Sequence, residues 1–231
     1  MKNLNWYKIA TLMDEISRFG PESPLDPEDP EDKPRIEWLA QKLNVPFDKV
    51  VSYLQQHNGL MYDWYSREYF TNQYGWSVPS QEAIEKIKKF VEGDSVLEIG
   101  SGYGMWAKLM KDDGISIYAT DHITAPGRDA HVPHKKSFID VEDLNAERAL
   151  QKYYGTNVLM MSWPPYESPM AATSLESFGG NKLIFIGEGQ GGCTADDRFF
   201  SILEKEWQSV GEVDIPRWTG IGDYLSFWRR K

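Results

Sequence analysis

The sequence predicts an α/β protein: a doubly wound, mostly parallel sheet with a C-terminal antiparallel hairpin, preceded by a small helical N-terminal domain. Three observations predict this class. Short apolar runs alternate with amphipathic segments from residue 80 onward, as parallel strands alternate with the helices that cover them. A glycine-rich turn follows the first apolar run, and the tail carries two β-rich runs around Thr219 to Gly222.

Residues 1–76 are predicted to be a helical N-terminal region. An apolar helix face runs through residues 3–19 at spacings of three and four: Trp6, Ile9, Met13 and Ile16. Five prolines then predict an extended, acidic linker over residues 20–34. Residues 35–57 follow as a helix-turn-helix-like pair, whose predicted inward side chains are Leu39, Ala40, Leu43, Val45, Val50 and Leu54.

The helix-turn-helix-like pair raises the question of DNA binding. In DNA-binding examples the second helix carries basic and amide side chains to the bases and phosphates. Here that helix offers few such groups, and Asp48 near its start repels phosphate. We therefore interpret the pair as structural, with contact to DNA or to a protein partner as the alternative.

Residues 77–231 are predicted to form a single α/β domain. Its first helix begins after an N-cap at Ser80 and ends near Gly93. The strands expected after it are 95–99, 115–119, 136–141, 157–161 and 182–186, and the helices are 105–112, 143–153 and 195–209. The aromatic segment 62–76 before the domain is either a packed connection or, through Tyr74 and Trp76, a cover over a ligand.

Composition and charge limit the classes of function. The formal charge of −10 over 231 residues disfavours nucleic acid as a partner. No stretch approaches the roughly 18 uninterrupted apolar residues of a membrane helix, so no membrane partner is predicted. The single Cys193 and an N-terminus without a signal-peptide pattern predict a reducing, cytoplasmic setting.

The segment SVLEIGSGYG, residues 95–104, is the most informative part of the sequence. Gly100, Gly102 and Gly104 allow a tight turn and a close approach of the backbone to a ligand at a helix N-terminus. A dinucleotide site expects a glycine or alanine where Met105 stands, which argues against a nicotinamide oxidoreductase. Glu98 at the end of the strand would repel a pyrophosphate and attract a cationic amino acid group.

Asp121 closes the second predicted strand, in the sequence SIYATD. A carboxylate at that point accepts hydrogen bonds from both ribose hydroxyls in nucleotide-binding β-α-β units. The alternative is an aspartate that caps a helix or stabilises a loop. Together with the glycine turn, the ribose interpretation is favoured.

VLEIGSGYG, ATD and NVLMMSWPPY, in order over residues 95–166, resemble the nucleotide-binding half of class I, Rossmann-like S-adenosylmethionine-dependent methyltransferases. The resemblance implies S-adenosylmethionine as cofactor, with Glu98, Gly100 and Gly102 at its methionine end and Asp121 at its ribose. It also implies an acid at the adenine amine, for which Asp140, Glu142 and Asp143 are candidates. The full set of expected cofactor contacts is Glu98, Gly100, Gly102, Gly104, Asp121, Trp76, Asp143 and Ser162.

The segment SWPPY, residues 162–166, follows the fourth strand. It resembles the Asp/Asn/Ser-Pro-Pro-Tyr motif of methyltransferases that modify exocyclic amines of bases. Trp163 stands directly before the prolines and offers only an N–H donor, so a base is not identified as the acceptor. The alternative is a strand stop with core aromatics. Tyr166 is the predicted substrate-facing aromatic residue.

Glu188 lies among glycines after the fifth strand and is the predicted general base or a hydrogen-bond acceptor, with a flexible loop as the alternative interpretation. His131 and His134 form an isolated pair with no thiol pattern nearby, so no metal site is predicted.

The predicted function is therefore methyl transfer from S-adenosylmethionine to an unidentified acceptor, with a small molecule favoured. The alternative is a non-catalytic S-adenosylmethionine-binding or regulatory module that contacts DNA or a protein partner through its helix-turn-helix-like region. The sequence makes no prediction of the oligomeric state.

Overall fold

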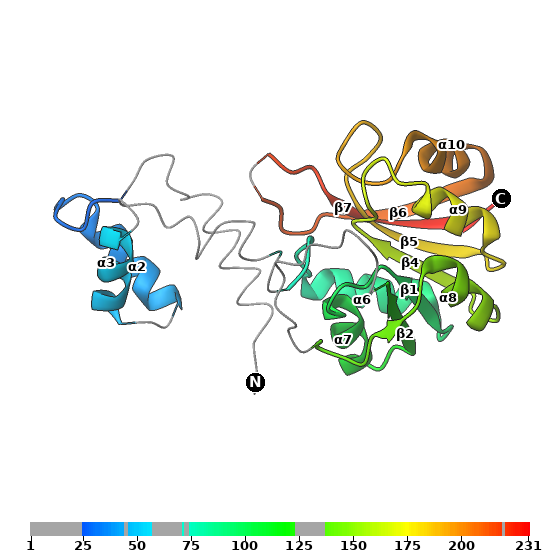
Figure 1. Cartoon of the computed structure of the whole chain (residues 1–231), viewed down its shortest axis with the longest axis horizontal. Coiled ribbons are helices and arrows are strands. Elements are labelled where there is room, and N and C mark those ends of the chain that lie inside the picture. Colours follow the sequence, from blue (N-terminus) through cyan, green and yellow to red (C-terminus); the bar gives the residue numbers. More distant parts are fainter. Residues whose placement is uncertain (1–24, 44–45, 57–70, 72–73, 123–136, 219) are drawn as a thin grey trace.

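The computed structural model describes residues 25–43, 46–56, 71, 74–122, 137–218 and 220–231, and Figure 1 shows a layered α/β domain and a pair of short helices. Several predictions lie outside the described residues: the helix over 3–19, most of the aromatic segment 62–76, and the histidines at 131 and 134.

One sheet organises the α/β domain, and among the described residues it has seven strands in the order β3-β2-β1-β4-β5-β7-β6. The strands are β1 (Val96–Ile99), β2 (Ile117–Asp121), β3 (Glu142–Asp143), β4 (Val158–Ser162), β5 (Lys182–Gly187), β6 (Trp207–Val213) and β7 (Tyr224–Arg230). β1 to β5 pair in parallel, whereas β7 is antiparallel to both β5 and β6. The predicted α/β class with a C-terminal antiparallel pair is confirmed.

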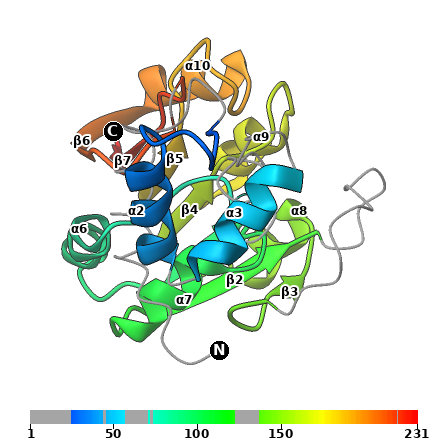
Figure 2. The same cartoon turned by 90° about the vertical axis from the view of Figure 1, so that its left-hand side faces the viewer.

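Helices cover both faces of the sheet (Figures 1 and 2). They are α6 (Gln81–Val91), α7 (Met105–Asp112), α8 (Ala146–Lys152), α9 (Met170–Ser177) and α10 (Asp197–Glu206). Successive strand residues point to opposite faces. On β1, Val96 packs in the core cluster that contains α6 and α7, and Leu97 packs in the cluster that contains α8, α9 and α10. Two apolar layers therefore enclose the sheet.

Side-chain caps fix the starts of three of these helices. The Ser80 hydroxyl accepts a hydrogen bond from the N–H of Ala83, as predicted. Asn145 and Asp196 cap α8 and α10 in the same way. The helix expected over 195–209 starts later than predicted, at Asp197. Before it, the Thr194 hydroxyl donates to the Glu188 carbonyl, 2.8 Å away.

The predicted strand over 136–141 is wrong in position, because among the described residues of this segment it is residues 142–143 that pair with β2. The residues before them pack on the glycine turn instead. The Phe138 N–H donates to the Tyr103 carbonyl at 2.9 Å, and Ile139 lies against Gly104.

The end of the chain also differs from prediction. α9 was not predicted, α10 stops at Glu206, and β6 starts directly after it. The two last strands are therefore joined by residues 214–223, a longer connection than a tight hairpin turn.

β6 forms one edge of the described sheet, and its pairing with β7 is irregular. A shift in register between Ser209 and Gly211 leaves Val210 outside the ladder. At the other edge, β3 contains only two residues, both acidic. Neither edge presents a long regular strand.

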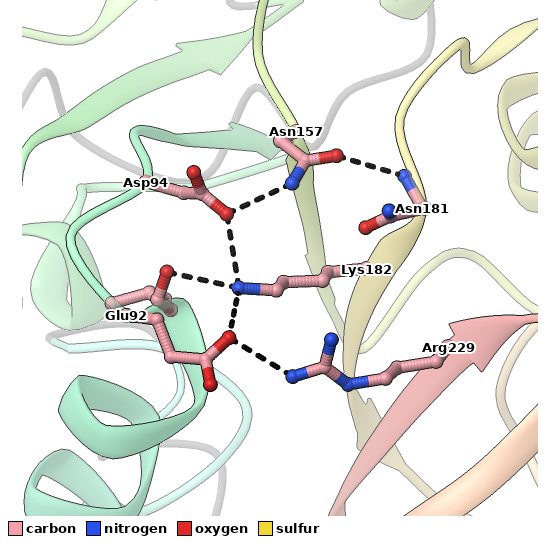
Figure 3. A network of polar contacts seen from close by, with 7 residues as sticks. Glu92, Asp94, Asn157, Asn181, Lys182 and Arg229 are labelled. Atoms are coloured by element: carbon pink, nitrogen blue, oxygen red, sulfur yellow. Dashed lines mark hydrogen bonds and ion pairs between the residues drawn. The ribbon is translucent and has the colours of Figure 1, made fainter.

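The amino edge of the sheet holds an ion-pair cluster around the buried Lys182 (Figure 3). Lys182 is 4% exposed, and its Nζ lies 2.7 Å from Glu92 and 2.9 Å from Asp94. Asn157 donates to the same Asp94 oxygen, and Arg229 donates to Glu92. These contacts join α6, β4, β5 and β7 where the parallel strands begin.

The N-terminal part contains α2 (Lys33–Leu43) and α3 (Phe47–Gln56), which pack against each other (Figure 2). Their shared core consists of Leu25, Ile36, Ala40, Val50 and Leu54. α2 and α3 thus lie where the sequence predicts two short helices, although α2 starts before the predicted residue 35. Pro34 lies in its first turn, where a missing N–H costs nothing.

Candidate functional site

The turn between β1 and α7 depends on glycine. Gly100, Gly102 and Gly104 have φ angles of 72°, 58° and 74°, in the left-handed region that other residues rarely adopt. A Cβ atom at Gly104 would lie 2.5 Å from Ile139 Cγ2, so a larger residue does not fit. Gly104 caps α7 without a side-chain hydrogen bond, so the N–H groups of that first turn need other acceptors.

Asp121 links the end of β2 to this turn. Its Oδ2 accepts a hydrogen bond from the Gly102 N–H at 2.6 Å. The backbone reinforces the link, because the Ser101 N–H donates to the Thr120 carbonyl at 3.0 Å. The predicted ribose-binding acid therefore lies directly against the glycine turn, and part of its role is to hold that turn.

Glu98 is the most unusual polar group in the domain. It is 1% exposed, and its Oε2 has no hydrogen-bond partner among the described residues. Burial raises the pKa of Glu98 to about 8, and the negative charge of Asp121 adds to the rise, whereas a hydrogen bond from the Ala107 backbone opposes it. A cation beside this carboxyl group would favour its ionised form.

The acids around β3 have different surroundings. Glu142 is bonded to Lys152 and to the Tyr153 hydroxyl, which lies 2.7 Å away. These bonds lower the pKa of Glu142 and raise that of Tyr153. Asp143 points to the opposite face and pairs in register with Asp121. Of the two acids in the strand, Asp143 is the one on the side of the glycine turn.

Strand register brings four predicted site residues to one face and one edge. Glu98 pairs in register with Ala119 on β2 and with Met160 on β4. Ala119 lies two positions before Asp121, and Met160 lies two positions before Ser162. Because side chains alternate with a period of two, these three site residues share a face, and Asp143 joins them through its pairing with Asp121. They follow the strand order β3, β2, β1 and β4 along the carboxyl edge.

Ser162 belongs to a short chain of hydrogen bonds. Its Oγ lies 2.9 Å from Ser77 Oγ, which accepts the indole N–H of Trp106 at 2.8 Å. This chain ties the segment before α6 to the end of β4 and to α7. Ser162 therefore lies at the carboxyl end of β4, where its hydrogen bond links β4 to Ser77.

Trp76 and Trp163 flank this chain and stack on each other. Their ring centroids are 5.7 Å apart, with an interplanar angle of 24°. The indole N–H of Trp163 donates to Asp223 Oδ2 at 3.0 Å. Trp76 is 53% exposed, while Asp223 is buried. The predicted ligand cover at Trp76 is thus part of an aromatic pair.

The two predicted catalytic residues lie farther along the same edge. Tyr166 is exposed, and a hydrogen bond to Glu167 helps to raise its pKa after the larger effect of the Glu167 charge. Glu188 accepts the Cys193 N–H at 2.7 Å and the Gly222 N–H at 2.8 Å, one on each oxygen. Glu188 thereby joins the loop after β5 to the connection before β7.

Sequence reasoning missed Ser77, Trp106 and Asp223. Ser77 and Asp223 have no motif around them that marks them as site residues, and Trp106 reads as an ordinary helix core residue. The left-handed backbone of Trp163, with φ 51°, also left no signal in the sequence. The SWPPY segment predicted the end of the strand correctly, but it did not predict which side chains contact Ser162 and Trp163.

Within the described ranges, no group of three or more His, Cys, Asp or Glu side chains is placed to hold a metal ion. In that same part of the chain, no helix combines the length and the apolar character that a membrane crossing requires.

Comparison with protein-family models and with curated proteins gives no match. Among solved structures, the magnesium protoporphyrin IX methyltransferase of Synechocystis PCC 6803 with bound SAM is 12% identical, with 65% of this chain and 79% of that chain covered and a TM-score of 0.45. The 1,6-didemethyltoxoflavin-N1-methyltransferase of Burkholderia thailandensis gives 12% identity, coverage of 65% and 77%, and a TM-score of 0.45. The ribosomal protein L11 methylase of Lactobacillus delbrueckii is 18% identical, with 64% of this chain and 75% of that chain covered and a TM-score of 0.40. These are distant likenesses of fold.

Proposed function

We propose that this protein is an S-adenosylmethionine-dependent methyltransferase. The observation that carries the proposal is the buried Glu98 carboxyl group at the carboxyl end of β1, with one oxygen that has no partner among the described residues. A cationic amino acid group satisfies such a carboxyl, whereas a pyrophosphate is repelled by it. The glycine turn beside it leaves room for the backbone to approach a ligand.

The strand order supports an assignment of the other contacts. In this proposal Asp143 receives the adenine amine, Asp121 the ribose hydroxyls, and Glu98 with Gly100 and Gly102 the methionine end. Ser162 lies next along the edge on β4, and Gly104 keeps the turn closed against Ile139. The residues therefore follow the length of an extended nucleoside with an amino acid at one end.

S-adenosylmethionine supplies a methyl group on a positively charged sulfur, which a nucleophilic atom of the acceptor takes while the bonding electron pair returns to sulfur. The chain contributes alignment and exclusion of water, on which such transfer mainly depends. Rigid backbone at the glycine turn and at Trp163-Pro164-Pro165 provides the alignment.

We favour a small-molecule acceptor, because the net charge of −10 opposes polyanions. Tyr166 remains a candidate for contact with the acceptor. Glu188 remains a candidate base, although it would first have to release one of its two backbone hydrogen bonds. Its loop-holding contacts support a positioning role equally well.

Replacing Asp121 tests the cofactor assignment. Asp121→Ala is expected to weaken S-adenosylmethionine binding at least tenfold, about 1.4 kcal/mol, in titration calorimetry. Asp121→Asn keeps an acceptor for the Gly102 N–H, so it separates loss of the turn from loss of the charge. Asp214→Ala removes an acid whose side chain is 89% exposed, and this control should bind as the wild type does. Absence of binding by the wild-type protein would contradict the proposal.

Activity requires a second experiment. The protein is incubated with methyl-labelled cofactor and cell extract, and the products are divided by size filtration, protease and nuclease. Label in the small-molecule filtrate supports the proposal, and label removed by protease or nuclease contradicts the small-molecule acceptor. Cofactor binding without any transfer favours the non-catalytic alternative.

A further inference from the structure

The pair of Trp76 and Trp163 is held in a fixed position from both sides. The Trp163 N–H donates to the Ile186 carbonyl at 2.8 Å, and its indole N–H donates to the buried Asp223. Pro164 follows, and its carbonyl accepts the Ala195 N–H at 3.1 Å. On the other side, Ser77 is bonded to Trp106 and lies directly after Trp76. These hydrogen bonds fix the backbone at Trp163 and the residue that follows Trp76.

The backbone of Trp163 is itself strained. Its φ angle of 51° lies in the left-handed region, which is unfavourable for a bulky residue and especially for one that precedes proline. The contacts with Ile186 and Asp223 maintain this conformation. Strain retained in this way at a ligand-facing edge is typical of residues that present a side chain to a substrate.

The pair also lies at the correct level of the sheet. β1 and β4 are neighbours, and Ile99 pairs in register with Met161, so the next residues, Gly100 and Ser162, are level with each other. Trp163 is one residue further, at a lateral strand spacing of about 4.8 Å. The indoles therefore lie beside the turn that receives the methionine end in the proposed function.

The chemistry of the pair selects one class of ligand. The indole N–H of Trp163 donates to Asp223, so this indole offers its ring and not a donor to a ligand. The two indoles stack on each other, so one face of each is covered by its partner, and the 53% exposed Trp76 is the ring on which a flat apolar ligand can stack. A cationic ligand is disfavoured, because its charge would approach the positively charged end of the cofactor. An acceptor atom that is protonated would also have no lone pair with which to take the methyl group.

We propose that Trp76 and Trp163 form the platform on which a flat, uncharged aromatic acceptor stacks, with Asp223 as the residue that positions Trp163. This inference rests on the proposed methyltransferase function and adds the substrate class to it. It assigns Trp76 to the acceptor, in place of the cofactor contact expected from the sequence.

The experiment uses the full chain in two steps. S-adenosylhomocysteine binding is first measured by calorimetry, and its absence would refute the proposed function itself. With S-adenosylhomocysteine saturating, binding of 2-naphthol is then compared with that of its saturated counterpart, decahydro-2-naphthol, by saturation-transfer NMR at pH 7. Both probes are uncharged and share a skeleton, but only one is flat. We expect at least tenfold tighter binding of 2-naphthol.

Variants of the exposed ring complete the test. Trp76→Ala is expected to weaken 2-naphthol at least fivefold and to leave S-adenosylhomocysteine affinity within twofold, while Trp76→Phe retains most of the binding. Tyr154→Ala removes an 85% exposed aromatic after α8 and serves as the control. Equal binding of the two probes, no 2-naphthol binding despite intact S-adenosylhomocysteine binding, an unaffected Trp76→Ala, or a tenfold loss of its S-adenosylhomocysteine affinity would each overturn the inference.

Discussion

The two ends of the parallel strands differ in how completely a buried ionisable side chain is hydrogen-bonded. At the amino edge, Lys182 is surrounded by two carboxylates and a backbone carbonyl, and each partner is held by further contacts (Figure 3). At the carboxyl edge, Glu98 is buried with one oxygen lacking a partner among the described residues. A completed cluster stabilises the fold, whereas an incomplete one leaves a place for a ligand.

The two edges also have opposite pH dependences. Hydrogen bonds from Lys182 lower the pKa values of Glu92 and Asp94, so their contribution to stability is present at neutral pH and is lost on acidification through those pKa values. The pKa of Glu98 is raised to about 8. Between the ordinary value of 4.5 and about 8, the unfolded chain loses this proton while the folded one keeps it, so rising pH lowers stability.

The largest expected effect comes from Glu98→Gln. This variant removes the cost of the buried acid, so its free energy of unfolding should exceed that of the wild type at pH 8 and approach it at pH 5. The difference changes by up to about 1.4 kcal/mol for each pH unit in that window. Urea denaturation at pH 5, 6.5 and 8 measures it.

The same variant should bind S-adenosylmethionine less tightly, since it cannot become an anion. A wild-type protein whose stability, relative to Glu98→Gln, does not fall between pH 5 and pH 8 would contradict the contrast between the edges.

Lys182→Met tests the completed edge. Two carboxylates lose their cation, but both are partly exposed and regain water, so we expect a loss of about 2 kcal/mol in the free energy of unfolding. Urea denaturation at pH 7 measures the loss, and S-adenosylhomocysteine affinity should not change. Lys88→Met removes an exposed lysine that pairs with Asp113, and this control should have little effect. A Lys182→Met protein as stable as the control would show that the cluster is not stabilising.

The smallest effect is expected from Arg229→Met. Arg229 donates to Glu92 at the rim of the same cluster, where both side chains are substantially exposed. Water screens this pair, so the shift in the urea midpoint should be less than a quarter of that caused by Lys182→Met. A shift as large as that of Lys182→Met would show that the exposed pair of Arg229 and Glu92 contributes as much to stability as the contacts of the buried lysine.

Much of the fold could be predicted because local signals and packing agree. The apolar run before Gly100 and the amphipathic pattern after Met105 gave β1 and α7 within one residue. The segment 136–141 has an equally apolar pattern, yet Ile139 is used to cover Gly104 and not to extend the sheet. Periodicity reports which residues are buried but not which neighbour buries them.

The candidate site was predictable where it depends on strand ends and less so where it depends on side-chain partners. Glu98, Asp121 and Ser162 follow from the register of parallel strands. The bond between Trp163 and Asp223 joins residues that are distant in the sequence and carries no local pattern. Such contacts are decided by tertiary packing, which a single sequence does not display.

The irregular pairing of β6 has a consequence for the protein at high concentration. An outer strand offers free backbone groups to other copies of the chain, and long flat edges promote aggregation. Because Val210 is excluded from the ladder, β6 presents two short segments that do not lie on one straight line. The opposite border is only two residues long, which is too short to offer a regular strand for pairing. Both borders of the described sheet thereby discourage strand-to-strand association.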